Sequence, residues 1–516
     1  MINQNNQTNK NLVYNIVNLL FTIVIAIFYI PYLVQTLGIL AYGIVPLALL
    51  VNQYIRVLTV SLTNSLTRFY SLAIQQINPN LASQYLSSAI IAITIFLIFL
   101  TPVLIWIIVK IENIFNIPDE YIYDAKLLFS FIFLGFFLSL YSSIINITLY
   151  ANNRLDSLNV IGISRLILKV LITVCFFEIL SGNVSYIGYA SFASEFFVLV
   201  LSVLYYKKNI DLNVKISFKN FNKIVLLSML SMSIWVVVQQ LGDTAMYRTD
   251  NFLVNKFWGT RESGILGAIT ELGNYIMVIV SVISSLFGPL ILIAYSKGDH
   301  RKVQELSIRS SLWVGLTSSL IVGVLVGFSQ PLLEFWIGEK YGLYSDWLIF
   351  KIISIPFYAS AGIFSFVFRA WNKIFFPAVI TLMIGLINLF ISYLILSFSN
   401  QNEIYIKYML IVSLLFTIIQ SYGLSSFWYL KLYPKLKKTI FIAFLKILIA
   451  LLLASLFSEC YNRFVKIDNL FDLAIGLILV AILTMPILFY TLISTIDRKI
   501  IINYFLKHIN KNVIKC

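Results

Sequence analysis

Six basic side chains stand inside long apolar stretches of this chain: Arg56, Arg165, Lys169, Arg248, Lys351 and Lys446. A charge in the middle of such a stretch is costly, and by default it marks a binding site or an ion pathway. Guanidinium and ammonium groups that face one water-filled space bind phosphate or carboxylate groups through charge-assisted hydrogen bonds. The chemistry that these residue types predict is therefore reversible binding of an anion.

Amides and carboxylates accompany these cations at helical spacing. Asn52 precedes Arg56 by one turn, and Arg165 and Lys169 share one helix face. A second set of polar residues, which includes Gln239 and Asp243, stands in the apolar stretch that leads to Arg248. We predict that a single substrate cavity is lined by these residues: Asn52, Arg56, Arg165, Lys169, Gln239, Asp243, Arg248 and Asp250.

Most of these residues also have a structural explanation. Arg165 and Lys169 stand near one end of their stretch and can extend to an interface, and Lys351 can do the same. Arg248 and Asp250 can pair with each other. One polar stripe suits helix packing as well as cavity lining, and it consists of Asn11, Asn15, Asn18 and Thr22.

Three acids are candidates for coupling to a cation: Glu195, Asp250 and Glu271. Whether that cation is H+ or Na+ is left open. No metal or other cofactor is predicted, because the few histidines and cysteines are scattered and form no ligand pattern. A serine–histidine triad and a phosphate-binding Gly-x-x-x-x-Gly-Lys-Ser/Thr loop are also absent from the sequence.

The elements that position these side chains are membrane-spanning helices. Hydrophobic residues make up 60% of the 516 positions, which exceeds the roughly 45–50% of soluble domains. Apolar runs of about 20 residues can cross a bilayer, and continuous runs predict helices rather than a barrel. We predict fourteen spans, at 12–34, 43–65, 85–109, 122–149, 157–180, 184–206, 224–252, 264–296, 310–333, 346–368, 374–398, 406–430, 439–458 and 470–496. The first is predicted to be a retained span and not a cleaved signal peptide.

The net charge of +15 is explained by orientation and not by nucleic-acid binding. With both termini on the cytoplasmic side, cytoplasmic loops and tails hold 23 of the 37 basic residues, and the outer loops with their edges hold eight. Cytoplasmic loops of membrane proteins accumulate lysine and arginine. We therefore predict a multi-pass membrane protein with both termini in the cytoplasm.

Short motifs recur along the chain at nearly one offset. Gly38 and Gly43 follow Leu-Val-Gln as Gly259 and Gly264 follow Leu-Val-Asn, and the glycines are related by an offset of 221. Two further matches occur at offsets of 220 and 219: Phe115 to Tyr121 with Phe335 to Tyr341, and Ala151 to Arg154 with Ala370 to Lys373. Three matches at one kind of loop favour duplication over chance.

Each copy has six spans, and an even number returns the chain to its starting side, so the copies share one orientation. The predicted fold is an all-α integral membrane protein of about 14 helices, with two pseudo-symmetric six-helix lobes. The domains are 1–223 for the first lobe, 224–438 for the second, and 439–516 for two extra spans with a basic tail.

The motifs resemble those of polysaccharide flippases in the multidrug/oligosaccharidyl-lipid/polysaccharide exporter superfamily. The resemblance rests on Tyr14 to Leu20, Leu33 to Ile44, Arg248 to Val254 with Gly259, and Phe335 to Gly338, and it covers spans 1 to 12. Within this superfamily, the chain resembles the Wzx-type O-antigen flippases. The chain departs from many of these in having fourteen spans, the number in peptidoglycan lipid flippases, whose arginine-rich first span is missing here.

The resemblance implies two MATE-like lobes around a cavity that opens to each side in turn. It implies that Arg56, Arg165, Arg248 and Asp250 meet the pyrophosphate or acidic sugars of a polyprenyl-pyrophosphate-linked oligosaccharide. The resemblance implies a location in the bacterial inner membrane. The expected function is translocation of repeat units for O-antigen or capsule across it, without enzymatic chemistry. The expected partners are the lipid-linked oligosaccharide, the bilayer, a polysaccharide polymerase and a chain-length regulator, and no nucleic acid.

Two other functions stay open. A cation-coupled multidrug exporter of the same fold would need an acidic cavity, whereas basic residues dominate here. A membrane polysaccharide polymerase or ligase would carry a large outer loop with catalytic residues, whereas the predicted outer loops are short and lack histidine.

Overall fold

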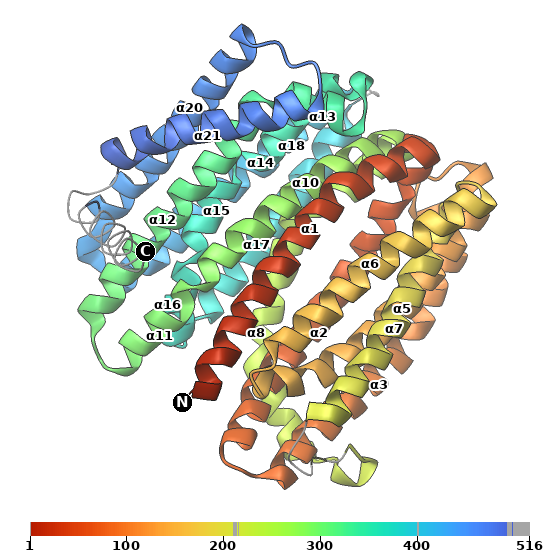
Figure 1. The fold of residues 1–516 in the computed structure, drawn as a ribbon, viewed down its shortest axis with the longest axis vertical. Coiled ribbons are helices and arrows are strands. Elements are labelled where there is room, and N and C mark those ends of the chain that lie inside the picture. Colours follow the sequence, from red (N-terminus) through yellow and green to blue (C-terminus); the bar gives the residue numbers. More distant parts are fainter. Residues whose placement is uncertain (1, 210–213, 215, 400–401, 493–497, 499–516) are drawn as a thin grey trace, which may run out of the picture. The chain divides into compact units, whose positions relative to one another are not determined.

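The computed structural model describes most of the chain as helices joined by short turns (Figure 1). The described residues are 2–209, 214, 216–399, 402–492 and 498. Within these ranges the regular structure is entirely helical, which confirms the predicted fold class. Lys215, His508 and most of the predicted basic tail lie outside the described residues.

The helices divide into two compact units. Unit 1 comprises residues 1–272 and 374–413, and unit 2 comprises 273–373 and 414–516. The helices of unit 1 are α1 (Ile2–Tyr42), α2 (Ile44–Gln75), α3 (Pro79–Val109), α4 (Ile111–Ile114), α5 (Ile122–Ala151), α6 (Leu155–Leu180), α7 (Ser185–Asn209), α8 (Lys223–Tyr247), α9 (Asp250–Trp258) and α17 (Phe375–Ser397). Two helices cross the boundary: α10 (Thr260–Ser285) and α18 (Ile404–Ile418).

The helices of unit 2 are α11 (Phe287–Ser296), α12 (His300–Gly327), α13 (Ser329–Ile337), α14 (Ser345–Ile352), α15 (Ile355–Gly362), α16 (Phe364–Ala370), α19 (Ser426–Leu432), α20 (Lys437–Phe464) and α21 (Leu470–Leu492). The boundary predicted after Lys223 lies inside unit 1. Packing units and sequence repeats are different divisions of a chain, so the two lobes stay a prediction.

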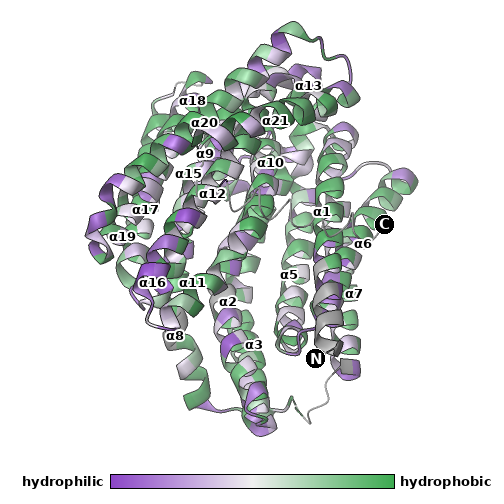
Figure 2. Ribbon diagram, turned by 60° about the vertical axis from the view of Figure 1, so that its left-hand side comes forward, coloured by the Kyte–Doolittle hydropathy of each residue, from purple (hydrophilic) through white to green (hydrophobic). Residues whose placement is uncertain are grey.

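The number of spans agrees with the sequence. Twelve helical segments are long and apolar enough to cross a membrane, and two bent pairs raise the number to 14. Exposed isoleucine, leucine and phenylalanine side chains cover the long helices, as on α3, and polar residues gather mainly at helix ends (Figure 2). Such a surface suits lipid, and we conclude that the protein is a multi-pass membrane protein.

Hydropathy does not reveal the breaks within these spans. Between Val57 and Leu62 the second span bends by 45°, and between Leu230 and Ile234 the seventh bends by 44°. The seventh span is predicted to run to residue 252, whereas α8 ends at Tyr247 and α9 begins at Asp250. The tenth span consists of α14, α15 and α16, and proline occupies the first turn of α15.

The turns of the two halves have one geometry. Ile77 and Gly298 are related by an offset of 221, and their φ angles are 53° and 72°. The next residues, Asn78 and Asp299, each cap the following helix by accepting the backbone N–H of Leu81 or Lys302, at 3.0 Å and 2.9 Å. This pair of turns repeats, although the sequence motifs did not include it.

Two asparagines repeat in the same way. Asn153 and Asn372 are related by an offset of 219, and both have positive φ, of 56° and 51°. The next amides, of Arg154 and Lys373, donate to the carbonyls of Leu149 and Phe368 at 2.9 Å and 2.8 Å. Such shared turns are what a duplicated chain predicts.

Two equivalent glycines meet within unit 1. A β-carbon on Gly264 would lie 2.6 Å from the carbonyl oxygen of Ile39 and 3.0 Å from Cα of Gly43. A β-carbon on Gly43 would overlap the carbonyl oxygen of Thr260. Because Ile39 and Thr260 are equivalent positions of the repeat, the contact is reciprocal, and the glycines allow this close backbone approach.

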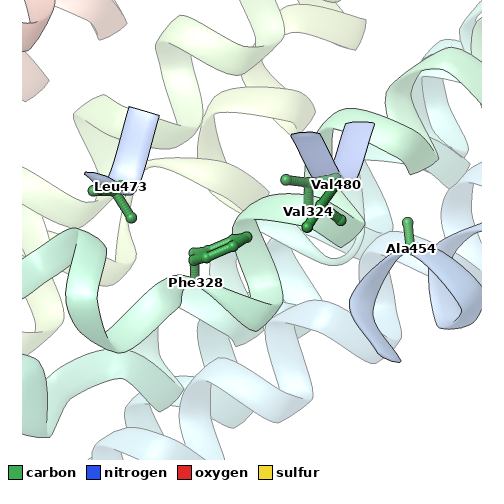
Figure 3. Packing of buried hydrophobic residues seen from close by; sticks show 5 residues of the cluster. All are labelled: Val324, Phe328, Ala454, Leu473 and Val480. Carbon is green, nitrogen blue, oxygen red and sulfur yellow. The ribbon is translucent and has the colours of Figure 1, made fainter. Parts of the chain in front are cut away.

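The two helices beyond the repeat, α20 and α21, belong to unit 2 and pack against α12. Buried residues of α20 and α21 form a cluster with Val324 and Phe328 at the end of α12 (Figure 3). Small residues allow α12 and α20 to approach closely, since a β-carbon on Gly323 would lie 2.6 Å from the β-carbon of Ala454. Lys446 of α20 donates to the carbonyl of Leu492 at 2.6 Å, which gives this cation a structural role.

Candidate functional site

A polar pocket of about 190 Å³ lies in unit 1 between α2, α5, α6 and α7. Its polar lining residues are Asn52, Ser139, Arg165, Lys169, Ser191, Ser194 and Glu195. Three of the eight predicted substrate residues, Asn52, Arg165 and Lys169, therefore line one pocket. It also includes Glu195, which was predicted for cation coupling.

Close packing of α5 against α7 fixes one wall of this pocket. A β-carbon on Gly135 of α5 would lie 3.3 Å from Cα of Phe192, and one on Gly188 of α7 would lie 3.0 Å from the carbonyl oxygen of Leu128. The two backbones can approach this closely because both positions are glycine. Ser191, Ser194 and Glu195 follow on the same helix and reach the pocket from that wall.

Opposite charges meet inside the pocket. Nη1 of Arg165 lies 3.6 Å from Oε1 of Glu195. The other carboxylate oxygen, Oε2, is buried without a hydrogen-bond partner among the described residues, and so is Oδ1 of Asn52. Nζ of Lys169 lies 5.8 Å from the ring centre of Tyr29 on α1, in cation–π geometry. The pocket thus holds two cations, one anion and polar atoms whose hydrogen bonds are not all satisfied.

The remaining predicted arginines lie near this charge cluster. Arg56 of α2 is exposed and lies within electrostatic range of Arg165, Glu195 and Arg248. Lys169 lies within electrostatic range of Glu271 as well as Glu195. Electrostatic interactions therefore connect side chains of α2, α6, α7 and α10 with Arg248 at the end of α8, as one cavity would require. Their roles in binding stay a prediction.

A second buried polar cluster in unit 1 contains Asp250. This side chain is 2% exposed and stands in the first turn of α9, where the helix dipole favours a negative charge. Oγ of Ser413 lies 3.2 Å from Oδ1 of Asp250 and 3.3 Å from the side chain of Asn388. The cluster is rich in oxygen atoms and carries a buried acid.

Gln239 and Asp243 lie on α8, which packs against α17. The contact is close, because a β-carbon on Gly385 would lie 2.5 Å from the carbonyl oxygen of Gly242. Asp243 is half-buried, and its Oδ1 has no hydrogen-bond partner within the described part of the chain. Neither Gln239 nor Asp243 lines the pocket described above, so the structure does not bring all predicted side chains into one pocket.

The asparagine stripe of the first span packs α1 against α6. Asn18 Nδ2 donates to Asn159 Oδ1 at 2.9 Å, and Asn159 Nδ2 donates to Asn15 Oδ1. Asn11 Nδ2 donates to the carbonyl of Asn153 at 3.0 Å. Between helix packing and cavity lining, which the sequence left open, the hydrogen bonds support helix packing.

The sequence analysis did not predict the neutral polar residues of these clusters: Tyr29, Ser139, Ser191, Ser194, Asn388 and Ser413. They are neutral residues within apolar runs, which gives them no signal of their own. The repeat relates Ser194 to Ser413 at an offset of 219. Lys169 stands in the same relation to Asn388.

Known structures resemble this arrangement over most of the chain. An inward-facing multidrug resistance MATE family transporter of the MOP superfamily aligns with a TM-score of 0.65, covering 82% of this chain and 96% of that one at 16% identity. The lipid II flippase MurJ in an inward closed conformation aligns with a TM-score of 0.62, covering 94% and 99% at 16% identity. This chain has a MATE-like fold.

Sequence comparisons point the same way. Residues 236–394 of this MATE-like chain match the family model described as MatE. An uncharacterized membrane protein, EpsK of Bacillus subtilis (strain 168), is 24% identical over 389 residues, which cover 72% of this chain and 74% of that protein. The predicted resemblance to the exporter superfamily is supported at the level of the fold, and the narrower Wzx-type assignment stays a prediction.

Proposed function

We propose that this protein is a flippase that moves lipid-linked oligosaccharides across a bacterial inner membrane. The substrate would be a polyprenyl-pyrophosphate-linked repeat unit for O-antigen or capsule. The observation that carries the proposal is the pocket that Arg165 and Lys169 line together within helices of membrane-spanning length. The named function of one structural neighbour, a lipid II flippase, supports the same substrate class.

The composition of the pocket favours an anionic group over a cationic drug. Arg165 and Lys169 line it, and Arg56 adds a third positive charge within electrostatic range. Its volume of about 190 Å³ is below the roughly 300–1,000 Å³ of sites for drug-sized ligands. The pocket would therefore hold the phosphate end of the headgroup, while the sugars lie outside it and the prenyl chain stays in lipid.

Translocation of this kind needs no covalent step and no enzymatic residue. It needs two conformations of similar free energy whose relative populations change when the headgroup binds. We propose that both termini face the cytoplasm, so that the loading side is the side of the basic loops. A polysaccharide polymerase and a chain-length regulator remain the proposed partners on the product side.

Coupling to H+ or Na+ would involve the acids of unit 1. Asp250 is buried beside Ser413 and Asn388, an oxygen-rich setting that suits a hard cation or a proton. Glu195 and Glu271 are the other proposed coupling residues. The second candidate function is a cation-coupled multidrug exporter. The same acids could couple export to a cation, and another structural neighbour is named as a multidrug resistance transporter.

Transport by the purified protein in vesicles tests the proposal. A fluorescent prenyl-pyrophosphate oligosaccharide is loaded in one leaflet, and its appearance in the other is followed by quenching. Arg165→Ala and Lys169→Ala should each reduce flipping by about 10- to 100-fold, the worth of one or two charge-assisted hydrogen bonds. Arg463→Ala is the control, because this exposed arginine pairs one turn away with Glu459.

Undiminished flipping by both variants would overturn the proposed anion pocket. Export of cationic dyes by the wild type, without flipping of the prenyl-pyrophosphate probe, would favour the multidrug exporter instead.

A further inference from the structure

Glu195 occupies the position of an anion in the pocket. Its Oε1 lies 3.6 Å from Nη1 of Arg165, and its side chain is 18% exposed. Its Oε2 is buried and has no hydrogen-bond partner among the described residues. The carboxylate therefore neutralises part of the positive charge, but it does not use its full capacity to accept hydrogen bonds.

The charges that act on Glu195 are positive. Arg165 and Lys169 face it from α6, and Arg56 acts on it from α2. From α5 the pocket is lined by residues that do not ionise: Ile132, Gly135, Phe136 and Ser139. Among the described residues that line the pocket, Glu195 is thus the one acid, and Glu271 acts on the same cluster through Lys169.

A phosphate group and the Glu195 carboxylate cannot both use these cations without repelling each other. Two like charges at hydrogen-bonding distance repel each other strongly in a setting less polar than water. A pocket of about 190 Å³ leaves little room to separate them. A proton on Glu195 would remove the repulsion, release Arg165, and turn the carboxyl into a hydrogen-bond donor toward a phosphate oxygen.

We propose that Glu195 competes with the headgroup for Arg165 and Lys169, and that binding of the headgroup is coupled to uptake of one proton by Glu195. The inference rests on the proposed function and names its coupling residue and ion. The proton comes from water as the phosphate enters, and it returns to water when the phosphate leaves.

The exchange has two consequences for transport. The headgroup moves with one negative charge fewer, and the empty pocket returns with Arg165 paired to Glu195 instead of uncompensated. By linkage, a proton raises the affinity for the headgroup by the same factor by which the headgroup raises the affinity for the proton. Headgroup binding should therefore weaken as pH rises, for as long as Glu195 titrates.

Calorimetry on the full-length protein in detergent can count the protons. Farnesyl pyrophosphate is titrated in two buffers that differ in ionisation enthalpy, which yields the number of protons taken up per bound ligand. We expect net uptake by the wild type. We expect Glu195→Gln to lose that uptake, apart from the contribution of the pyrophosphate itself, and to bind with an affinity that depends less on pH.

Two further variants keep the test decisive. Glu195→Asp retains an acid and should retain proton uptake, whereas a merely structural role would make it behave like Glu195→Gln. Glu178→Gln is the matched control, since this glutamate accepts a hydrogen bond from Tyr32 and does not line the pocket.

Three results would count against the proposals. Equal proton uptake by the wild type and Glu195→Gln would overturn the role of Glu195 and leave the flippase proposal intact. Loss of binding in Glu195→Gln would contradict the competition, because removal of a competitor should strengthen binding. Absence of binding to the wild type would overturn the proposed anion site itself, and this inference with it.

Discussion

Two polar clusters of unit 1 stand at equivalent positions of the repeat and carry opposite charge. In the first half, Lys169 of α6 lies near Tyr29, and Ser194 of α7 lines the same pocket. Asn388 and Ser413 are the equivalents of Lys169 and Ser194 in the second half, at an offset of 219, and Ser413 also contacts Asp250. Equivalent positions thus hold a cation in one copy and an amide in the other, with a phenol near the first and a carboxylate near the second.

The comparison separates what the fold requires from what the site requires. Turns such as those at Asn153 and Asn372 keep one conformation in both halves, because a changed turn would redirect a whole helix. Interior side chains have changed in charge while their neighbours correspond: Ser413 contacts Asn388 as Ser194 shares a pocket with Lys169. Duplication therefore supplies two similar frames, and substitutions of single residues make them different sites.

The largest effect is expected where the two halves touch, at Gly43 and Gly264. Alanine at either position would place its β-carbon against a backbone carbonyl, of Thr260 or Ile39. Because the backbone atoms of a packed helix cannot move far enough to relieve this overlap, we expect each variant to lose about 3 kcal/mol or more of its free energy of unfolding. Thermal unfolding in detergent measures this loss. Gly362→Ala is the control, because no described atom lies within 4 Å of its added carbon, and equal stability of all three variants would refute the close contact.

The next effect tests the charge difference itself. Lys169→Asn gives the first half the residue of the second, and it should weaken binding of farnesyl pyrophosphate by about 10-fold or more, the worth of one charge-assisted hydrogen bond. Asn388→Gln changes the equivalent position without a charge and should leave that binding unchanged. Equal losses in the two variants would mean that the clusters do not differ in their ligand.

Asp250→Asn tests the other cluster. The amide keeps the shape of the side chain and can still contact Ser413, but it carries no charge to bind a cation. Since Glu195 is proposed to take up the proton, Asp250 is the candidate for a second cation such as Na+. We expect headgroup binding to be nearly unchanged, while any dependence of flipping on a Na+ gradient is lost. Flipping in vesicles with and without the gradient makes the measurement, and a dependence that persists in this variant would exclude Asp250 as the site.

Much of this arrangement was predictable from the sequence, and the failures have physical causes. Apolar runs predict the spans because the bilayer fixes their length, and charges within them predict Arg165 and Lys169 as pocket residues. The breaks after Val57 and Leu230 have no proline or glycine signal. Tyr29 carries no charge and stands in an apolar run, so no feature of the sequence marks it. Packing partners such as α8 and α17 depend on tertiary contacts that periodicity does not encode.

The smallest effect tests whether the shared turns are equally strained. Asn153 and Asn372 adopt positive φ, which asparagine tolerates better than other residues that have a β-carbon. Alanine at either position should cost about 1 kcal/mol, and glycine should cost less or stabilise. Since both turns form the same backbone hydrogen bonds, the two alanine variants should lower the unfolding temperature by similar amounts. If only one alanine variant lost stability, surrounding contacts and not the local conformation would determine the stability of the other turn. The two halves would then have diverged in backbone structure as well as in charge.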